Sequence, residues 1–428
     1  MSVPRIKPIR VLWTVNIVLP AVANELGVVP TPFGGWLTQM LEQMAALPDF
    51  KIGVAMRSPL PKLQCLERSG ITYYALPQLK KNISDVSDAD CLQVVRDFSP
   101  DIMHAHGSEM PYTKRFLRNY DGPKILSLQG VINGIAPYQL GRMSIVSMLL
   151  NPLQPRRVAI ALALILNERF RFRPRLRAER ETFLLANYVI GRTVWDHAHT
   201  IALNPVAQYL HCGEILRSAF YAKTWSIDRC RKKSIFIGNS SSPLKGAHIA
   251  VRALALLRRD YPDVKLFFAG PDPRSSSKLS LRGQFGYQAY LLSLIEELGL
   301  ENQITFTGQL AAEEMASRMC DSNVYLLPSL IENSPNTLGE AMAMGVPSVA
   351  AYVGGVPSIA ADEKEALLYR ADDPVMLAFQ VRRLFDDDAL CERLAVAARL
   401  RAAEAYDPLT NRDLLVAAYR LIGSQASV

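Results

Sequence analysis

Short apolar runs alternate with helix-like patterns along the chain. In the first half, the apolar runs cover residues 11–18, 51–55, 102–105, 124–128 and 188–190. The segments between them carry apolar residues at the three- and four-residue spacing of amphipathic helices. Strands that alternate with helices in this way form a parallel sheet with helices on both faces. The first 215 residues therefore predict one doubly wound α/β domain.

The same pattern starts again near residue 233. Its apolar runs lie at residues 234–237, 265–269, 303–306, 324–327 and 346–350. The segment between the two halves has no sustained period, and 428 residues exceed what one hydrophobic core usually serves. We therefore expect an N-terminal domain over residues 1–215, a linker over 216–232, a C-terminal domain over 233–405 and a final helix over 406–428.

The start of the chain has two interpretations. Residues 11–23 resemble a secretory signal, because Arg5, Lys7 and Arg10 precede an apolar run with an Ala-x-Ala ending. They also read as the central strand of the first domain, followed by a loop with Gly34 and Gly35. Removal of residues 1–23 would destroy that unit, so we expect the strand.

Two glutamates eight residues apart are the strongest functional signal. The apolar strand at 324–327 leads into a polar turn with Pro335, and the helix-like run that follows stops at Gly345. A helix start offers unpaired N–H groups and a partial positive charge, which suit phosphate. Glu332 would lie in the loop and Glu340 about one turn inside the helix. One carboxylate could hold a sugar's hydroxyls while the other holds a ribose.

Several further segments, together with these glutamates, resemble one known family. They are Gly34–Gly35, Pro100–Gly107, Val189–Asp196, Phe236–Asn239 with Lys245–Gly246, Phe268–Pro271 and Phe306–Gly308. The chain resembles the retaining glycosyltransferases of family four. Their architecture, GT-B, consists of two Rossmann-like doubly wound domains that face each other across a cleft. The segments Tyr209–Arg217 and Glu332–Asn336 are most similar to transferases that build bacterial surface polysaccharides.

The resemblance implies roles for residues of both domains. Glu332 would position the donor sugar, and Lys245 would bind its diphosphate. His106 would act beside the reacting sugar, and strand alternation places it on the same face as His104. The implied catalytic residues are thus His106, Glu332 and Lys245. The implied donor-binding positions are Gly34, Gly35, Gly238, Asn239, Lys245, Asn333, Ser334, Asn336, Thr337, Leu338 and Glu340, the last of these for the ribose.

The diphosphate site departs from the family pattern at one position. An ammonium about 4 Å from a phosphate oxygen gains roughly 4 kcal/mol at an effective dielectric of 20, which suits Lys245. The family usually has an arginine directly after the strand-end glycine, where this chain has Asn239. Either Asn239 supplies neutral donors, or an arginine elsewhere reaches in. No strand ends in the Asp-x-Asp pair that holds a divalent cation, so we expect no metal and no cofactor.

The net charge of +8 is concentrated in one part of the chain. Eight arginines surround the uncharged run Val158–Leu166: Arg156, Arg157, Arg169, Arg171, Arg173, Arg175, Arg177 and Arg180. Nine apolar residues cannot cross a bilayer, which needs about 20, although they could lie in its surface. Residues 143–180 thus fit either peripheral contact with an anionic membrane or a helical hairpin with solvated arginines.

The composition also bears on other partners and on location. Aromatic residues interleaved with base-reading polar residues are missing, which argues against nucleic acid. Six scattered cysteines without metal-ligand spacing fit a reducing cytoplasm. We expect a cytoplasmic protein, with the inner face of the plasma membrane as the place of any peripheral contact.

These observations predict transfer of a hexose from a nucleotide diphosphate sugar to a hydroxyl of a growing polysaccharide or lipid-linked saccharide. Retention of configuration is implied by the resemblance alone. One alternative is a transferase with a small soluble acceptor, which would not need the apolar and basic span 143–180. Others are a non-catalytic nucleotide-sugar-binding subunit and a nucleotide-sugar epimerase. The context of Glu332 and Glu340 disfavours the epimerase.

Overall fold

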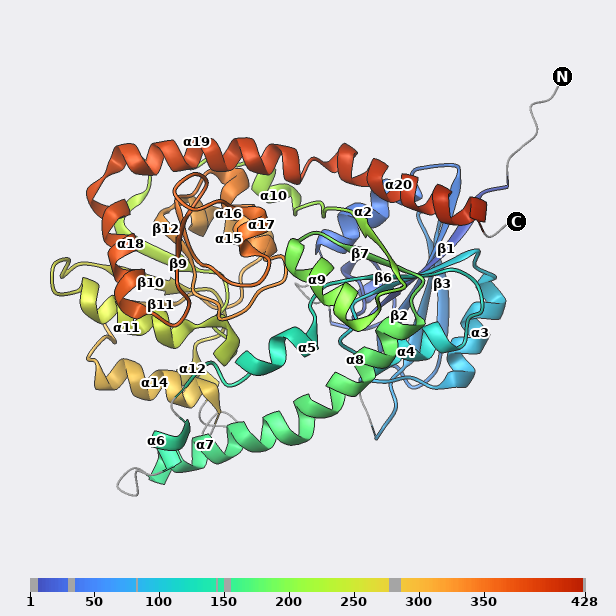
Figure 1. The fold of residues 1–428 in the computed structure, drawn as a ribbon, viewed down its shortest axis with the longest axis horizontal. Helices are drawn as coiled ribbons and strands as arrows, with labels where there is room; N and C mark the ends of the chain where they lie inside the picture. Colours follow the sequence, from blue (N-terminus) through green and yellow to red (C-terminus); the bar gives the residue numbers. More distant parts are fainter. Residues whose placement is uncertain are drawn as a thin grey trace. The chain divides into compact units, whose positions relative to one another are not determined.

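The computed structural model describes residues 7–29, 35–81, 84–143, 145–149, 155–276 and 286–425. The chain forms two compact α/β units (Figure 1). Unit 1 comprises residues 1–134, 174–216 and 406–428, and unit 2 comprises residues 135–173 and 217–405. Each unit is built around its own sheet.

The sheet of unit 1 has the order β3-β4-β2-β1-β5-β6-β7-β8. Its strands are β1 (Ile9–Val15), β2 (Phe50–Ser58), β3 (Gln64–Arg68), β4 (Ile71–Pro77), β5 (Ile102–His106), β6 (Lys124–Ser127), β7 (Tyr188–Gly191) and β8 (Gln208–His211). The five predicted strands are confirmed, and residues 11–15 form part of the central strand. The prediction of a wholly parallel sheet is wrong at β3, which pairs with β4 in antiparallel fashion. β3 is largely exposed and polar, so it gives no apolar signal.

Helices cover both faces of this sheet. They are α1 (Pro20–Ala23), α2 (Gly35–Ala45), α3 (Asp88–Phe98), α4 (Pro111–Arg118), α5 (Ile132–Ile135), α8 (Arg173–Leu185), α9 (Val194–Leu203) and α20 (Pro408–Gln425). Alternation along β1 sends Trp13 into a core shared with α2 and α20, and Leu12 into a core shared with α3 and α4. β1 is therefore buried on both faces, as a central strand requires.

The sheet of unit 2 has the order β11-β10-β9-β12-β13-β14, and all its pairs are parallel. Its strands are β9 (Arg231–Ile237), β10 (Lys265–Phe268), β11 (Ile304–Phe306), β12 (Ser322–Leu327), β13 (Ser348–Ala351) and β14 (Leu367–Tyr369). The five predicted strands are confirmed, and the short β14 is additional. The strand order reverses between β9 and β12. In open α/β sheets, ligands bind at such a switch point, beyond the carboxyl ends of the strands.

The helical elements of unit 2 come from two parts of the chain. They are η1 (Ala136–Tyr138), α6 (Ile145–Leu149), α7 (Pro155–Asn167), the π-helical turn η2 (Glu168–Phe172), α10 (Ser218–Tyr221), η3 (Pro243–Lys245), α11 (Ala247–Leu257), α12 (Pro273–Ser276), α14 (Tyr287–Glu297), α15 (Ala312–Cys320), α16 (Asn336–Met344), α17 (Val356–Ile359), α18 (Pro374–Asp386) and α19 (Asp388–Ala405).

Residues 135–173 differ from their predicted place, because they lie with unit 2 and not with the N-terminal domain. Polar contacts hold them there. The imidazole Nε2 of His248 lies 3.0 Å from the carbonyl oxygen of Gly141. Arg142 pairs with Asp372 at 2.7 Å, and α7 packs against α14. These partners lie far along the chain, so local periodicity could not predict the grouping.

The predicted linker also differs. Residues 217–232 pack into unit 2, where Phe220 and Trp225 are buried. The backbone N–H of Trp225 donates to Met344 at 2.9 Å, and its indole N–H donates to Ser322 at 2.8 Å. At the other end, the chain enters unit 1 again at Tyr406, and α20 packs against α2 and β5.

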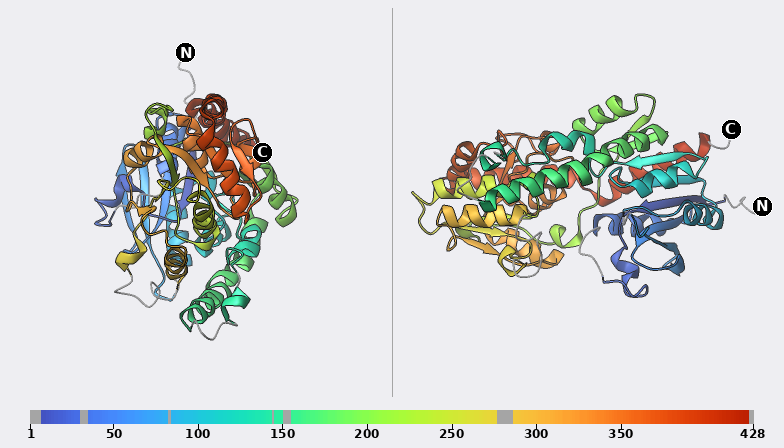
Figure 2. Two further views of the ribbon diagram at one scale, coloured as in Figure 1. Left: turned by 90° about the vertical axis from the view of Figure 1, so that its left-hand side faces the viewer. Right: turned by 90° about the horizontal axis from the view of Figure 1, so that it is seen from below.

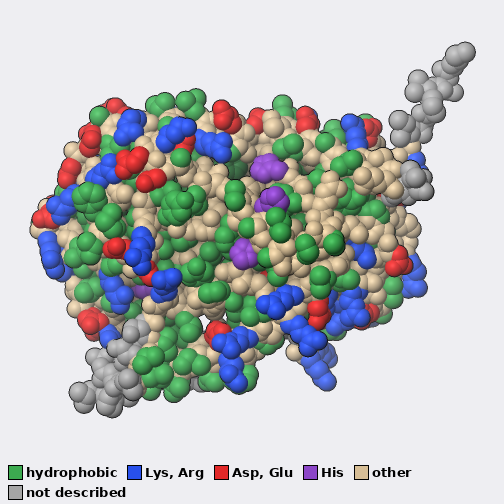
Figure 3. All heavy atoms as spheres, in the orientation of Figure 1, with side chains coloured by type: hydrophobic (Ala, Val, Ile, Leu, Met, Phe, Trp, Pro, Cys, Tyr) green, Lys and Arg blue, Asp and Glu red, His purple; other side chains and the backbone are tan. Residues whose placement is uncertain are grey.

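α7, η2 and α8 follow one another without a break, as the right-hand view of Figure 2 shows. On the face seen in Figure 3, hydrophobic side chains gather over α6 and α7. Lys and Arg side chains lie beyond them, towards the C-terminal end of α7 and η2. Among the helices of the described residues, none combines the length and the apolar character needed to cross a membrane.

Candidate functional site

Two loops meet at the switch point of unit 2. One follows β9 and contains Gly238 and η3, and the other follows β12 and leads to α16. They are packed so closely that a Cβ atom on Gly246, which has a φ of +67°, would lie 1.9 Å from the carbonyl oxygen of Pro328. A third loop, after β13, also comes close: a Cβ atom on Gly354 would lie 2.0 Å from the carbonyl oxygen of Glu332. Glycine at both positions allows the loops to converge around Glu332.

Lys245 and Glu332 form an ion pair at the centre of these loops. The Nζ atom of Lys245 lies 2.6 Å from Oε1 of Glu332. The hydroxyl of Ser329 donates to the same oxygen at 2.7 Å. The Glu332 side chain is mostly buried, whereas about a third of the Lys245 side chain is exposed. An ammonium group at the rim of the switch point can thus reach an anionic ligand.

Glu340 has a cationic partner of its own. It lies in the second turn of α16 and is 3% exposed. The Nε atom of Arg217 donates to Oε1 of Glu340 at 2.7 Å, and Nη2 donates to Oε2 at 2.8 Å. The guanidinium also covers the ring of Phe220, 4.6 Å from its centroid. Each of the two glutamates is therefore held by one cation, and sequence reasoning had not identified Arg217.

Tyr325 of β12 lies near both glutamates. Its hydroxyl donates to Oγ1 of Thr337 at 2.7 Å. Burial raises the pKa of Tyr325, and the nearby carboxylates of Glu332 and Glu340 raise it further. The two glutamates thus act on one phenol, which places their carboxylates in the same part of the unit.

The start of α16 differs in detail from the expected phosphate cradle. Pro335 precedes the helix, and its carbonyl oxygen accepts the backbone N–H of Leu338 at 3.0 Å. The Leu338 amide, one of the predicted donor-binding groups, thus already has an acceptor within the turn. Asn336 and Thr337 begin the helix, while Asn333 and Ser334 lie in the loop before it.

The side chain of Asn239 bonds within its own loop. Its Oδ1 atom accepts the backbone N–H of Ser241 at 2.8 Å. Gly238, just before it, lies against α15, because a Cβ atom there would be 2.9 Å from Cε of Met315. The sulfur of Met315 is in turn 3.6 Å from Nη2 of Arg217. One side chain therefore separates Arg217 from the glycine that precedes Asn239.

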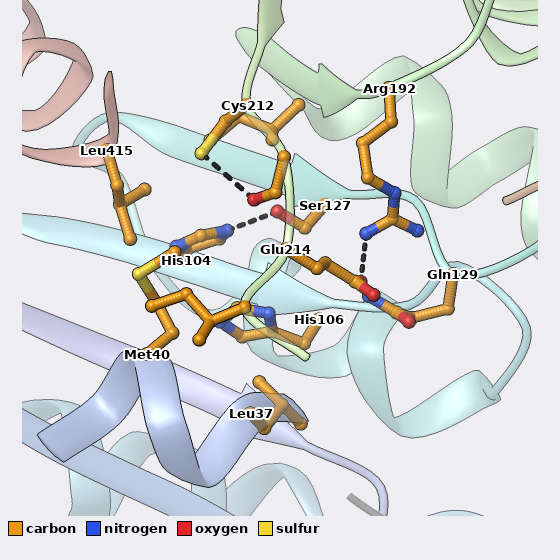
Figure 4. A pocket seen from close by; sticks show the side chains of 13 residues that line it. Leu37, Met40, His104, His106, Ser127, Gln129, Arg192, Cys212, Glu214 and Leu415 are labelled. Carbon is orange, nitrogen blue, oxygen red and sulfur yellow. Dashed lines mark hydrogen bonds and ion pairs between the residues drawn. The ribbon is translucent and has the colours of Figure 1, made fainter. Parts of the chain in front are cut away.

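A second polar site lies in unit 1, at the carboxyl ends of β5, β6 and β7. It is a cavity of about 30 Å³, enough for a water-sized group, and Figure 4 shows its lining side chains. Its polar residues are His104, His106, Ser127, Gln129, Arg192 and Glu214. Leu37 and Met40 of α2 close it on one side, and Leu415 of α20 contributes a further apolar contact.

The two histidines of the cavity are neutral. Their ring centroids are 4.1 Å apart, so the predicted common face is confirmed. Burial lowers the pKa of His104 to about 3. Burial also lowers the pKa of His106, and the nearby charge of Arg192 adds to this effect. A neutral imidazole has one donor and one acceptor nitrogen, which suits a hydroxyl group.

The charges of the cavity cancel. Nη1 of Arg192 donates to Oε1 of Glu214, and Nη2 donates to the carbonyl oxygen of Leu128 at 2.9 Å. Nε2 of Gln129 lies 3.3 Å from the same Glu214 oxygen. Arg192 and Glu214 both occur in segments that carry the family resemblance, although no role was assigned to them. Since the guanidinium is already paired with a carboxylate, the cavity suits neutral polar groups better than anions.

A buried carboxylate holds the loop that follows β5. Glu179 of α8 is fully buried and accepts the hydroxyl of Ser108 at 2.6 Å. It also accepts the backbone N–H groups of Ile132 and Asn133 at 2.8 and 2.7 Å. These bonds fix the backbone directly after His106 and Gly107.

Two other predicted positions bear on this site. Gly35 is the first residue of α2, the helix whose Leu37 and Met40 line the cavity. Gly34 lies outside the described residues. Among the described residues, no group of three or more His, Cys, Asp or Glu side chains is arranged to hold a metal ion.

Comparison with known proteins gives a family match within unit 2. Residues 221–401 match the family described as "Glycosyl transferases group 1". The D-inositol 3-phosphate glycosyltransferase of Streptomyces avermitilis is 31% identical over 164 residues, which are 38% of this chain and 34% of that protein. This chain thus spans about a third of that relative's length.

Solved structures are similar over nearly the whole chain. Sucrose-phosphate synthase from Thermosynechococcus elongatus has a TM-score of 0.72 at 17% identity, with coverage of 97% of this chain and 100% of that one. HepE of Anabaena, in complex with UDP-glucose, has a TM-score of 0.63 at 18% identity, with coverage of 96% and 98%. The predicted GT-B fold is confirmed.

Proposed function

We propose that the protein is a glycosyltransferase. It moves a hexose from a nucleotide diphosphate sugar to a hydroxyl of a growing polysaccharide or lipid-linked saccharide, and the configuration at the anomeric carbon is retained. The main support is the ion pair between Lys245 and Glu332 at the switch point of unit 2. This pair lies within residues 221–401, the part of the chain that matches group 1 glycosyl transferases.

Different residues of unit 2 bind different parts of the donor. Lys245 binds the diphosphate, because its ammonium is the exposed partner of its ion pair. Glu332 receives hydroxyls of the hexose, and Glu340 receives the ribose. The first turn of α16, with Asn336 and Thr337, adds the partial positive charge of a helix start to the diphosphate site.

The chemical step exchanges one bond of the anomeric carbon for another. The acceptor hydroxyl forms a new C–O bond on the face from which the diphosphate leaves, and the bond to the diphosphate oxygen breaks. The proton of the acceptor hydroxyl passes to a leaving phosphate oxygen. Lys245 stabilises the charge that develops on the diphosphate, and one such preorganised donor typically contributes about 10²- to 10³-fold in rate.

The cavity of unit 1 supports a saccharide as the partner of the reaction. His106 is neutral, and Arg192 is balanced by Glu214. Neutral donors and acceptors of this kind suit a hydroxyl group. With a volume of about 30 Å³ the cavity has room for one such group, so it can take a single hydroxyl of a saccharide acceptor.

The experiment is a measurement of nucleoside diphosphate release. A panel of nucleotide sugars is first screened by thermal shift, since a ligand raises stability by mass action. The best donor is then incubated with saccharide acceptors. We expect acceptor-dependent release in the wild type and a loss of about 10²-fold or more in Glu332→Gln. Glu365→Gln is the matched control, because Glu365 is also a buried carboxylate of unit 2 paired with a lysine. Equal turnover by Glu332→Gln and the wild type would refute the role of Glu332.

We also propose that the acceptor is met at an anionic membrane surface. Leu162, Leu166 and Phe170 follow each other at four-residue intervals and are 49%, 54% and 67% exposed. Arg169 and Arg171 stand beside them, and within the described part of the chain neither has a charged partner. An exposed apolar stripe with adjacent arginines matches the interface of an anionic bilayer.

Co-sedimentation with vesicles tests this contact. We expect binding to vesicles that contain phosphatidylglycerol, and weaker binding to pure phosphatidylcholine or at high salt. Replacing Leu162, Leu166 and Phe170 by serine should abolish sedimentation. Leu400→Ser, which changes an equally exposed leucine of α19, should leave it unchanged. Sedimentation of the triple variant at the wild-type level would exclude this surface.

A further inference from the structure

Tyr325 has no role in the scheme above, yet its hydroxyl is bonded to Thr337, one of the predicted donor-binding residues. We propose that Tyr325 is a positioning residue, which holds the Thr337 hydroxyl so that its proton is donated to the diphosphate of the nucleotide sugar. The inference rests on the proposed function, because it takes Thr337 as part of the diphosphate site. It adds a residue from the core of β12, outside the segment from Glu332 to Glu340.

Tyr325 and Thr337 lie at the switch point of unit 2. Tyr325 belongs to β12, and Thr337 is the second residue of α16. A Cβ atom on Gly238, directly after β9, would be 3.5 Å from Cγ2 of Thr337 and 3.7 Å from the hydroxyl of Tyr325. Both hydroxyl-bearing side chains thus border the space that the glycine leaves open, at the place where an open α/β sheet binds its ligand.

The hydrogen bond between the two hydroxyls runs from the phenol to the threonine. Their oxygens are 2.7 Å apart, and a phenol is a stronger acid than an aliphatic alcohol, so it is the better donor. Burial raises the pKa of Tyr325, and the carboxylates of Glu332 and Glu340 raise it further, so the phenol keeps its proton. Tyr325 is 1% exposed, and among the described residues Thr337 is the one hydrogen-bond partner of its hydroxyl.

The Thr337 hydroxyl therefore keeps its own proton for another acceptor. Within the described part of the chain it donates to no protein group, and Thr337 is partly exposed. A phosphate oxygen at the start of α16 is a suitable acceptor, because the helix start attracts anions and a hydrogen bond to a charged group is roughly twice as strong as a neutral one. The bond from the phenol polarises the threonine O–H and strengthens the bond that it donates.

The test compares nucleoside diphosphates with nucleosides. Dissociation constants are measured by calorimetry for UDP, GDP and ADP, and uridine, guanosine and adenosine are measured as competitors. For the base that binds best, Thr337→Val should lower the preference for the diphosphate by about tenfold, as for a lost hydrogen bond to a charged group. Tyr325→Phe should lower it by about three- to tenfold, because the Thr337 hydroxyl loses the bond that orients it. The double variant should be no worse than Thr337→Val, since Tyr325 acts through Thr337.

Tyr290→Phe is the matched control, because Tyr290 is also a buried tyrosine of unit 2 whose hydroxyl has a side-chain partner, Arg252, at 2.9 Å. It should keep the wild-type preference. Thr337→Ser retains a hydroxyl and should stay within about twofold of the wild type. Lys245→Gln reports on the proposed diphosphate site itself and should lose at least as much of the preference as Thr337→Val. If Tyr325→Phe does not fold, as judged by circular dichroism, Thr337→Val decides the question.

The outcomes separate this inference from the proposed function. An unchanged preference in Tyr325→Phe, or in Thr337→Val if that variant decides, would overturn the inference. So would an equal loss of diphosphate and nucleoside affinity in Tyr325→Phe, because the phenol would then only support the fold of the site. Either result, together with a lost preference in Lys245→Gln, leaves the proposed function standing. A wild-type preference in Lys245→Gln, or a wild type that binds no nucleoside diphosphate, would contradict both.

Discussion

The Nδ1 atom of His104 lies 2.5 Å from the hydroxyl of Tyr419, a residue more than 300 positions farther along the chain. The indole N–H of Trp13 donates to the same hydroxyl at 2.8 Å. Nε2 of the same imidazole lies 2.6 Å from the hydroxyl of Ser127. Through this chain of hydrogen bonds, α20 holds the ring of a histidine that lines the cavity of unit 1.

Removal of the Tyr419 hydroxyl should destabilise unit 1. In Tyr419→Phe, the buried Trp13 N–H and His104 Nδ1 both lose their partner, so we expect the free energy of unfolding to fall by about 1–3 kcal/mol in urea denaturation. Tyr188→Phe is the control, because its hydroxyl bonds to Gln425 of α20 at an exposed position. An equal effect of the two changes would argue against a special role for the buried network.

The same histidine predicts a pH dependence of stability. Burial lowers the pKa of His104 to about 3 in the folded protein, below its ordinary value of 6.5. The unfolded chain therefore binds the proton more readily. The stability is fully present above pH 6.5 and declines as the pH falls towards 3, by up to about 1.4 kcal/mol per pH unit for this one group.

The slope is measured by urea denaturation at a series of pH values. His104→Gln should show a shallower decline between pH 6.5 and 4, whatever its stability at neutral pH. His197→Gln, which replaces an exposed histidine of α9, should keep the wild-type slope. An unchanged slope in His104→Gln would show that this imidazole does not carry the effect.

Glu179 should be far more important for stability than its neighbour Glu181. The Glu179 carboxylate accepts hydrogen bonds from Ser108, Ile132 and Asn133. Glu179→Gln keeps the shape of the side chain, but its amide N–H₂ group would then face some of these donors. We expect a loss of about 2–3 kcal/mol in urea denaturation, as for hydrogen bonds to a buried charge. Glu181→Gln, two residues along α8, changes an exposed carboxylate and should have little effect. Similar losses would mean that burial of Glu179 is not decisive.

Gly246→Ala tests the contact between the two loops of unit 2. Its Cβ atom would meet a backbone oxygen at 1.9 Å, whereas a Cβ atom on Gly299 has its nearest neighbour at 3.8 Å. Both glycines have a positive φ, so Gly299→Ala controls for the left-handed conformation, which costs about 1–2 kcal/mol. Gly246→Ala should cost about 1–3 kcal/mol more and weaken nucleotide binding. Equal stabilities of the two variants would show that the loops can separate at no cost.

Much of the fold could be predicted because it is encoded locally. The alternation of apolar and polar residues marked five strands in each half, and a central strand is apolar on both faces. Four strands of the described residues were missed. β3 and β8 have largely or partly exposed side chains and follow no apolar pattern, and β14 is only three residues long. β4 is buried, and its apolar run Ile71–Pro77 was not recognised as a strand. The helix that begins after Pro335 and ends at Gly345 was predicted because proline and glycine act on the backbone within one turn.

The sequence by itself determined the positions of Lys245, Glu332 and Glu340 relative to their strands and helices. It could not determine what each side chain binds. The pairing of Glu340 with Arg217, the contact of His104 with Tyr419 and the attachment of residues 135–173 to unit 2 join segments far apart in the chain. Hydrophobic periodicity specifies which face of an element is buried, but side chains acquire polar partners only when folding brings distant segments together.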